Sequence, residues 1–173
     1  MVKDFADEYR RYRILGEKAL AQMPDAALDV VPSPEGNSAG MIVRHVSGNL
    51  KSRFTDFRTS DGEKPWRDRE AEFAERSYSR SDVDTMWADG FAALTRALDG
   101  LTDDDLERSV AIRGQPLTVH QALARSVAHL AYHVGQLVLL AREHAERPWE
   151  TLSIARGGSA AYNANPTMER GPR

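Results

Sequence analysis

The segment TVHQALARSVAHLAYHVGQ, residues 118–136, decides the fold that we expect of this chain. Its apolar residues recur at intervals of three and four, which is typical of a helix that buries one face. Thr118 with Gln121 three residues later forms a capping box, the signature of a helix N-terminus. Apolar residues continue the pattern to about Glu146. The segment is therefore predicted to begin a long amphipathic helix.

Three further segments show the same periodicity, and turn-forming residues separate them. They cover approximately Lys3–Gln22, Ala39–Thr59 and Ser81–Asp99. Before the last helix, residues 102–105 are predicted to form a short helical turn, and residues 110–117 a small hairpin around Gly114. The tail, residues 148–173, shows no regular pattern, and we expect it to be irregular.

Four long amphipathic helices predict an all-α fold, a four-helix bundle in a single domain over residues 1–173. The connection between the second and third helices, Ser60 to Arg80, has few periodic apolar positions. At up to about 3.3 Å per residue, it is long enough to cross the whole bundle. The second and third helices can then run parallel, which gives an up-down-down-up order. In that order the start of the second helix and the end of the fourth share one pole.

The composition narrows the class of protein. The chain has no cysteine, which excludes disulfides, thiolate metal ligands and a cysteine nucleophile. Its net charge is −3, with both signs mixed along the sequence, so no nucleic-acid-binding surface is expected. No apolar run approaches the roughly 18 residues of a membrane span, and the N-terminus lacks the apolar stretch of a signal peptide. We therefore expect a cytoplasmic protein.

Three histidines are the candidate metal ligands. His129 and His133 stand four residues apart, so they share one face of the predicted last helix. His45 lies beside the apolar stripe of the second helix at a matching depth. Three neutral imidazoles can hold one divalent ion and leave its other positions open to water or substrate. Zinc suits such a site, and imidazole also accepts nickel, iron and cobalt. The other two histidines, His120 and His144, lie about two turns or more from the pair.

Two amides are candidate catalytic residues. Asn49 follows His45 by one helical turn, and Gln136 follows His133 by three residues, so either amide could hold a metal-bound water or a substrate oxygen. The alternative for each is a hydrogen bond within its own helix, and the alternative for a buried histidine is a bond to a backbone carbonyl. Glu72, Glu143 and the aspartates at 103–105 could in principle add a carboxylate ligand. No acidic residue is expected on the inner face near His45 or His133, however, so the predicted ligand set is histidine alone.

These motifs resemble those of the DinB-like (DinB/YfiT) superfamily of metalloenzymes. The resemblance rests on IVRHVSGNL, residues 42–50, and on residues 118–136 with their His-x-x-x-His-x-x-Gln pattern. The stretch DGEKPWRDR, residues 61–69, looks like one uncharacterised subgroup of that superfamily. The resemblance extends over nearly the whole chain.

The resemblance implies a four-helix bundle with a three-histidine site, usually for zinc or nickel, and frequent dimers. Carried over to this sequence, the ligands are His45, His129 and His133. Characterised relatives include transferases and isomerases that use low-molecular-weight thiols such as bacillithiol or mycothiol. The resemblance thus implies a small-molecule substrate and leaves a thiol cofactor open.

Two functions compete. The first is a metal-dependent enzyme, of hydrolase or thiol S-transferase type, in which the ion activates a water or a low-molecular-weight thiol. The second is a non-enzymatic metal-binding or stress-associated bundle protein. A purely structural dimer with unmetallated histidines ranks below both. An open coordination position beside a pocket would favour the enzyme.

Two irregular segments are predicted to form the pocket wall, namely residues 61–72 of the crossover and residues 153–163 of the tail. Function often resides on such segments. Arg67, Arg69 and Arg156 would then be available to bind an anionic part of a substrate, because guanidinium pairs with carboxylate in a forked geometry.

Self-association through a helical face is the expected assembly, in line with the dimers that the resemblance implies. Trp66, Phe73 and Trp149 lie in segments without a clear core stripe. Exposed aromatic side chains signal an interface only when they form a contiguous patch. The predicted oligomer is a homodimer.

Overall fold

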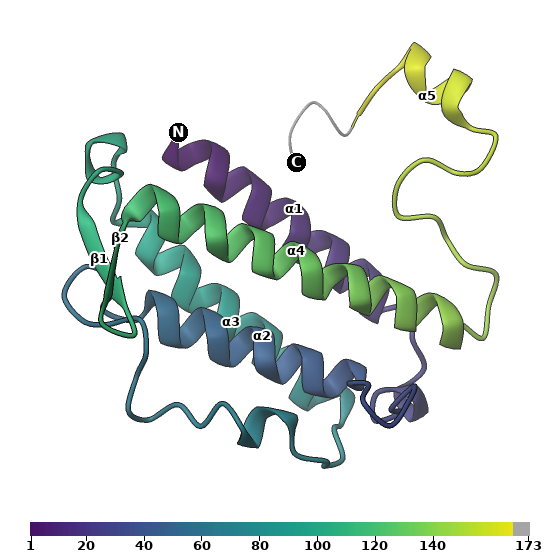
Figure 1. Cartoon of the computed structure of the whole chain (residues 1–173). Coiled ribbons are helices and arrows are strands. Elements are labelled where there is room, and N and C mark those ends of the chain that lie inside the picture. The colour runs from purple at the N-terminus through teal and green to yellow at the C-terminus, as the bar shows by residue number, and fades with distance from the viewer. Residues whose placement is uncertain (168–173) are drawn as a thin grey trace.

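The structure, a computed structural model, describes residues 1–167. Four long helices lie side by side as a bundle (Figure 1). Their bounds are Val2–Leu20 for α1, Ala39–Phe54 for α2, Arg80–Asp99 for α3 and Val119–His144 for α4. Helix α1 packs mainly against α4, and α2 packs mainly against α3. The prediction of a helical bundle is confirmed.

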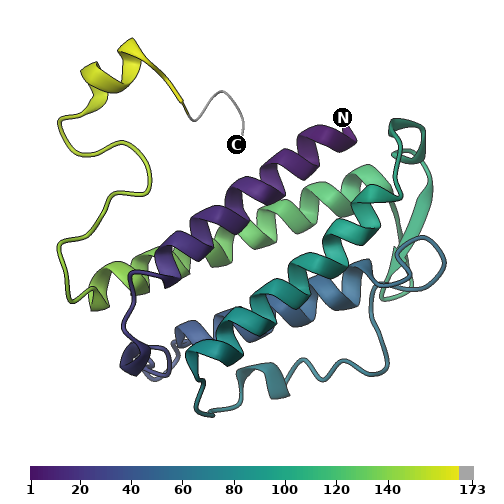
Figure 2. The same cartoon turned by 180° about the vertical axis from the view of Figure 1, so that it is seen from behind.

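The connection between α2 and α3 is a long crossover, residues 55–79. In Figures 1 and 2, α2 and α3 begin at one end of the bundle, and α1 and α4 begin at the other. The crossover returns along the outside of the bundle and contains a short 3-10 helix, Ala71–Phe73 (η2), which packs against α2. This return path brings irregular chain alongside α2.

A small hairpin lies between the end of α3 and the start of α4. Strands β1 (Ser109–Ile112) and β2 (Gln115–Thr118) pair antiparallel. The two turn residues, Arg113 and Gly114, have φ angles of 55° and 70°. A two-residue turn of type I′ requires positive φ at both positions. The hairpin predicted around Gly114 is therefore confirmed, and the mostly helical fold contains this small sheet as well.

Helix α2 ends before the predicted Thr59. Thr55 leaves the helix with ψ of 128°, and Asp56 has φ of 48°. This turn folds Phe57 back, so its ring centroid lies 5.2 Å from that of Phe54 and its side chain stays buried. Phe57 thus satisfies the apolar periodicity without belonging to the helix, which explains the overlong prediction.

The helix starts follow their capping residues. At α4, Thr118 and Gln121 bond to each other's backbone N–H groups, as the capping box predicts. At α3 the box is formed by Ser79 and Asp82, so the helix begins slightly before the predicted Ser81. Residues 103–105 form the short turn predicted after α3.

The tail was expected to be irregular, but it contains one short helix. Residues Ser159–Ala164 form α5, while residues 145–158 form neither helix nor strand. Figures 1 and 2 show α5 apart from the four long helices. Its residues are exposed or half-buried.

The core lies between the four long helices. Their fully buried apolar side chains include Val46, Leu94, Leu123, Leu130 and Leu137. Two histidines of the candidate site lie beside this core, since His45 is 4% exposed and His133 is 8% exposed. None of the helices in the described part of the chain combines the length and the apolar character needed to cross a membrane.

Candidate metal centre

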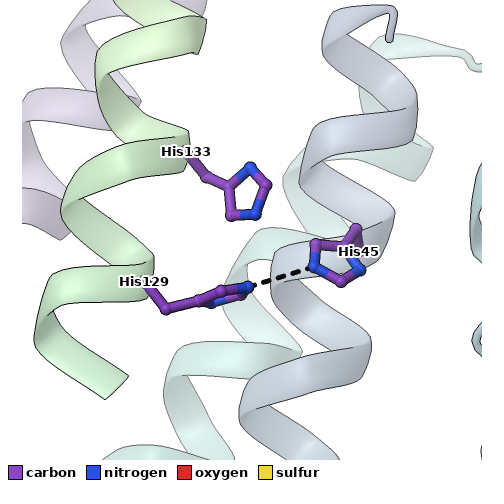
Figure 3. A group of neighbouring side chains, drawn as sticks. All are labelled: His45, His129 and His133. Carbon is purple, nitrogen blue, oxygen red and sulfur yellow. Dashed lines mark hydrogen bonds between the residues drawn. The ribbon is translucent and has the colours of Figure 1, made fainter. Parts of the chain in front are cut away.

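The three predicted ligands converge between two helices. His45 projects from α2 toward His129 and His133, which project from α4 (Figure 3). The Nε2 atoms of His45 and His129 lie 3.1 Å apart. One ring nitrogen from each of the three histidines lies within 4.8 Å of the others. Helix α4 presents its pair on one face because residues four apart lie one turn above each other.

This spacing fits a divalent metal ion. Imidazole nitrogens bind zinc at about 2.0–2.1 Å, so two nitrogens on one tetrahedral ion lie about 3.3 Å apart. The Nε2 atoms of His45 and His129 already have nearly this separation. Three imidazoles occupy only part of the coordination sphere of zinc, nickel or iron. The donor set therefore suits an ion with at least one open position.

Two of the imidazoles are held by hydrogen bonds at their other nitrogen. Nδ1 of His45 lies 2.8 Å from Oε2 of Glu72, and Nδ1 of His133 lies 2.8 Å from Oε1 of Gln136. Both partner atoms are acceptors, so each Nδ1 carries the proton and donates it. Each Nε2 then keeps its lone pair for a metal ion. Such outer partners fix the tautomer and the orientation of metal-binding histidines.

Glu72, which sequence reasoning considered as a carboxylate ligand and then set aside, lies beside His45. It lies in η2, its side chain is 7% exposed, and it accepts two bonds of 2.8 Å from the guanidinium group of Arg67. Gly48 makes room for it, because a Cβ at Gly48 would lie 2.0 Å from Oε1 of Glu72. The expectation that no acidic residue lies near His45 is therefore wrong. The crossover brings the carboxylate in from a segment without helical periodicity.

The two amide candidates have different surroundings. Gln136 accepts a hydrogen bond from His133 within the same helix, so it fixes the ring of a candidate metal-binding histidine. Asn49 lines a cavity beside His45, and its side chain forms no hydrogen bond with any residue that the structure describes. Asn49 therefore remains available to a ligand in that cavity.

The electrostatics of the site favour metal binding at neutral pH. The pKa of His129 is lowered to about 3, mainly by burial and then by the neighbouring histidines. Burial also lowers the pKa of His133. Burial alone would raise the pKa of Glu72, but the hydrogen bonds from His45 and Arg67 bring it below its ordinary value. Neutral imidazoles and an ionised carboxylate are the protonation states that a bound cation needs.

The low pKa of His129 predicts how the metal-free protein responds to acid. The pKa of this imidazole is about 3 when folded and about 6.5 when unfolded. Between these values the unfolded chain binds more protons, so the free energy of unfolding should fall as pH falls from 6.5 toward 3. Urea denaturation of the metal-free protein at pH 7.5 and pH 5 measures this fall. His129→Asn should make it smaller, and an unchanged pH dependence in that variant would contradict the prediction.

A cavity of about 340 Å³ lies beside His45 and His129. The crossover supplies Arg67 and Arg69 to its wall, as predicted, and the hairpin supplies residues 112–117 in part. Sequence reasoning did not foresee the hairpin's contribution. The cavity makes one side of the histidine cluster accessible to a small molecule.

The tail does not reach this cavity. Arg156 is exposed, and no residue of 153–163 lines the wall, so this part of the predicted pocket is wrong. The cavity extends from the histidines toward the start of α4. Helix α4 continues for eleven residues after His133 to His144, roughly 16 Å at 1.5 Å per residue, and carries the tail the other way.

The DGEKPWRDR stretch fastens the crossover to the hairpin. The carboxylate of Asp61 accepts hydrogen bonds from the backbone N–H groups of Glu63, Arg113 and Gly114, at 2.6, 2.8 and 2.7 Å. These bonds lower the pKa of Asp61. The same stretch supplies Arg67, which holds Glu72. One continuous segment thus connects the hairpin turn to Glu72, the hydrogen-bond partner of the candidate ligand His45.

Comparison with known families gives one family match. A family described as protein of unknown function (DUF1572) matches residues 1–158. Among curated proteins no match is found.

Several solved structures share the fold at low sequence identity. A conserved protein from Enterococcus faecalis aligns with a TM-score of 0.65 and 18% identity, over 85% of this chain and 98% of that one. A DinB-like protein from Bacillus cereus aligns with a TM-score of 0.63 and 18% identity, over 85% and 97%. A DinB-like protein from Bacillus subtilis aligns with a TM-score of 0.60 and 16% identity, over 87% and 95%. The fold of this chain is thus that of solved DinB-like proteins, as the resemblance predicts.

Proposed function

The chain belongs to the DUF1572 family, a DinB-like family, and from this premise we propose a metal-dependent enzyme whose ion is held by His45, His129 and His133. Bound there, a divalent ion supplies Lewis acidity, which lowers the pKa of a coordinated water or low-molecular-weight thiol. One observation carries the proposal: three imidazole nitrogens converge beside a cavity that a small molecule can enter.

The chain's own residues supply positioning. Glu72 and Gln136 fix the imidazoles of His45 and His133 with Nε2 toward the site. Asn49 lines the cavity one helical turn from His45, where its amide can bind a substrate oxygen. The burial of the histidines removes competing water, which strengthens their interaction with a cation.

The second candidate function is non-enzymatic metal binding. It is supported by the position of the ligands, since His45 belongs to the α2–α3 pair and the other two histidines belong to the α1–α4 pair. A bound ion would therefore connect the two pairs and stabilise the bundle. The cavity beside the site favours the enzyme instead, because a purely structural ion needs no access.

A substrate screen with controlled metal content separates these functions. The metal-free protein is loaded with zinc, nickel or iron and assayed for hydrolysis of activated esters and for conjugation of low-molecular-weight thiols to electrophiles. If the protein is an enzyme, turnover should appear with one of these metals. It should disappear in the His133→Ala variant and persist in the His144→Ala variant. Stoichiometric metal without turnover in either assay would support the non-enzymatic function. Zinc is the ion that we expect the purified protein to carry.

We also propose the up-down-down-up order for the four long helices. The directions in which the helices run in Figures 1 and 2, and the length of the crossover, support this order. It explains why an irregular segment lies beside α2 and can supply Glu72.

The proposed assembly is a homodimer. Of the aromatic residues expected at an interface, Trp66 is 55% exposed. Phe73 is half-buried beside the ring of His45, and Trp149 is half-buried against the core. The outer face of α4 offers a better candidate, since Tyr132 and Leu139 are 64% and 58% exposed and lie two turns apart on that face.

Sedimentation equilibrium tests the dimer. The expected mass is twice the 19.3 kDa of one chain, and Tyr132→Glu should return it to a monomer by placing a charge in the apolar contact. Val30→Glu, which adds a charge at an exposed loop position, is the matched control. A monomeric wild-type protein at high concentration would refute the proposal.

A further inference from the structure

The cavity beside the histidines has a strongly basic lining. Within residues 1–167, no aspartate or glutamate lines it. Five arginines do: Arg53, Arg67, Arg69, Arg113 and Arg125.

Three of these guanidinium groups form ion pairs with two glutamates that do not themselves line the cavity. Arg67 is 2% exposed and binds Glu72 through two hydrogen bonds. Arg53 and Arg113 share one carboxylate, that of Glu63, at 3.4 and 2.8 Å. The pKa of Arg53 is lowered chiefly by burial, which disfavours its charged form; the carboxylate of Glu63 raises it, and the charges of Arg67 and Arg113 lower it by less. Three guanidinium groups thus share two carboxylates, so this part of the wall keeps a net positive charge.

The other two arginines that line the cavity, Arg69 and Arg125, are exposed. Arg69 packs over the ring of Phe73 and pairs with Glu70, whose side chain is 88% exposed. Such an exposed pair contributes little and is easily exchanged for another anion. Arg125 forms no ion pair or hydrogen bond with any residue that the structure describes. Its guanidinium group is thus free to bind a ligand.

Arg125 is placed one helical turn from the metal site. It precedes His129 by four residues on α4, and Asn49 follows His45 by four residues on α2. Residues four apart share one helix face, and all four line the same cavity. A free guanidinium group and a free amide therefore lie on the same side of the histidines, about 5–6 Å along each helix.

The far part of the cavity is apolar. Phe54, which follows His45 by nine residues, or roughly 14 Å of helix, lines it together with Phe57, Ile112 and Leu117. A molecule that extends along the cavity from the histidines therefore contacts the candidate metal ligands first, then the arginines, and then these apolar side chains.

From this arrangement we propose that the substrate is a small organic oxyanion, a carboxylate or a phosphate ester, with an apolar body. Its anionic group binds the guanidinium of Arg125, and its apolar body packs against Phe54 and its neighbours. The inference rests on the proposed function, because it assigns the substrate class of the same site. Guanidinium binds planar oxyanions with two parallel hydrogen bonds, which also orients them. The reacting group is then held about one helical turn from the anion, at the histidines.

Calorimetric titration of the metal-free protein tests the anion site without relying on the metal. Benzoate and inorganic phosphate represent the two oxyanions, and benzamide is the neutral isostere of benzoate. Benzoate or phosphate should bind measurably, and benzamide at least about tenfold more weakly than benzoate, because a hydrogen bond to a charged group is the stronger one. The tighter of the two anions identifies the carboxylate or the phosphate class.

Two variants of α4 test whether Arg125 is the residue that binds the anion. Arg125→Gln should weaken anion binding about tenfold or more. Arg142→Gln makes the same change on α4 far beyond His133, and it should leave binding unchanged. Equal binding of the tighter anion to Arg125→Gln and to wild type would overturn the proposal, as would equal binding of that anion and benzamide or no binding of either anion. Circular dichroism confirms that both variants are folded.

Failure of the metal-enzyme proposal gives a different result. If the protein bound no stoichiometric zinc but still bound benzoate through Arg125, the anion site would stand and the proposed function would fall. If the zinc-loaded protein showed turnover in the substrate screen and neither anion bound, the proposed function would stand and the substrate class would be wrong.

Discussion

Replacing His133 with alanine should remove the bound divalent ion. His133 is one of three converging imidazoles, and no acidic residue in the described chain completes the cluster. Loss of an outer hydrogen-bond partner alone typically lowers metal affinity about 10–100-fold, so loss of a ligand should lower it by more than about 100-fold. Competition with a chromophoric chelator measures the zinc affinity, and elemental analysis of the purified protein measures its metal content.

Two other histidines provide matched controls for this change. His120 packs against Phe5 at the start of α4, and His144 ends the same helix. Alanine at either position should leave the zinc affinity unchanged. If the His133→Ala protein kept full stoichiometric zinc, the assignment of the site would be wrong.

Replacing Glu72 with alanine should destabilise the protein strongly, even without metal. The variant leaves the guanidinium group of Arg67 buried with no carboxylate partner, since the side chain of Arg67 is only 2% exposed. Removing one member of a buried ion pair costs about 3–5 kcal/mol. Urea denaturation of the metal-free protein should show a loss of this size. The same variant should bind zinc about 10–100-fold more weakly, because His45 loses the bond that orients it.

The control for this variant is Glu70→Ala. Glu70 also pairs with an arginine of the crossover, but its side chain is 88% exposed. Exposed ion pairs contribute about 0–1 kcal/mol, so this change should be nearly neutral. A loss of less than about 1 kcal/mol in Glu72→Ala would show that the buried pair does not hold the crossover in place.

Periodicity and capping predicted the helices because both signals are local. The capping box of Thr118 and Gln121 and the helical spacing of His129 and His133 can each be read within a few residues. The end of α2 was predicted too late, because Phe57 returns to the core through a turn and keeps the apolar rhythm.

The missing part of the site depends on contacts between distant segments. Glu72 reaches His45 from a crossover whose path no periodicity describes. Two local signs were present in the sequence: a glycine inside a helix, Gly48, and an arginine, Arg67, five residues before the glutamate. A helical glycine costs stability and therefore often marks a close approach, which here is the approach of the glutamate. Neither sign identifies the residue that makes the contact, so the residues of the cavity wall could be found only from the structure.

The division of the bundle into two helix pairs has a consequence for the lifetime of the protein in a cell. Helices α1 and α4 form one pair and α2 and α3 the other, and the three histidines face each other across the seam between them. An ion at this seam acts as a cross-link between residues 84 positions apart in sequence. A ligand that binds only the folded state shifts the folding equilibrium toward that state. Without metal, the two helix pairs should therefore separate transiently more often. Amide exchange in α2 and cleavage by proteases should then both report the metal supply.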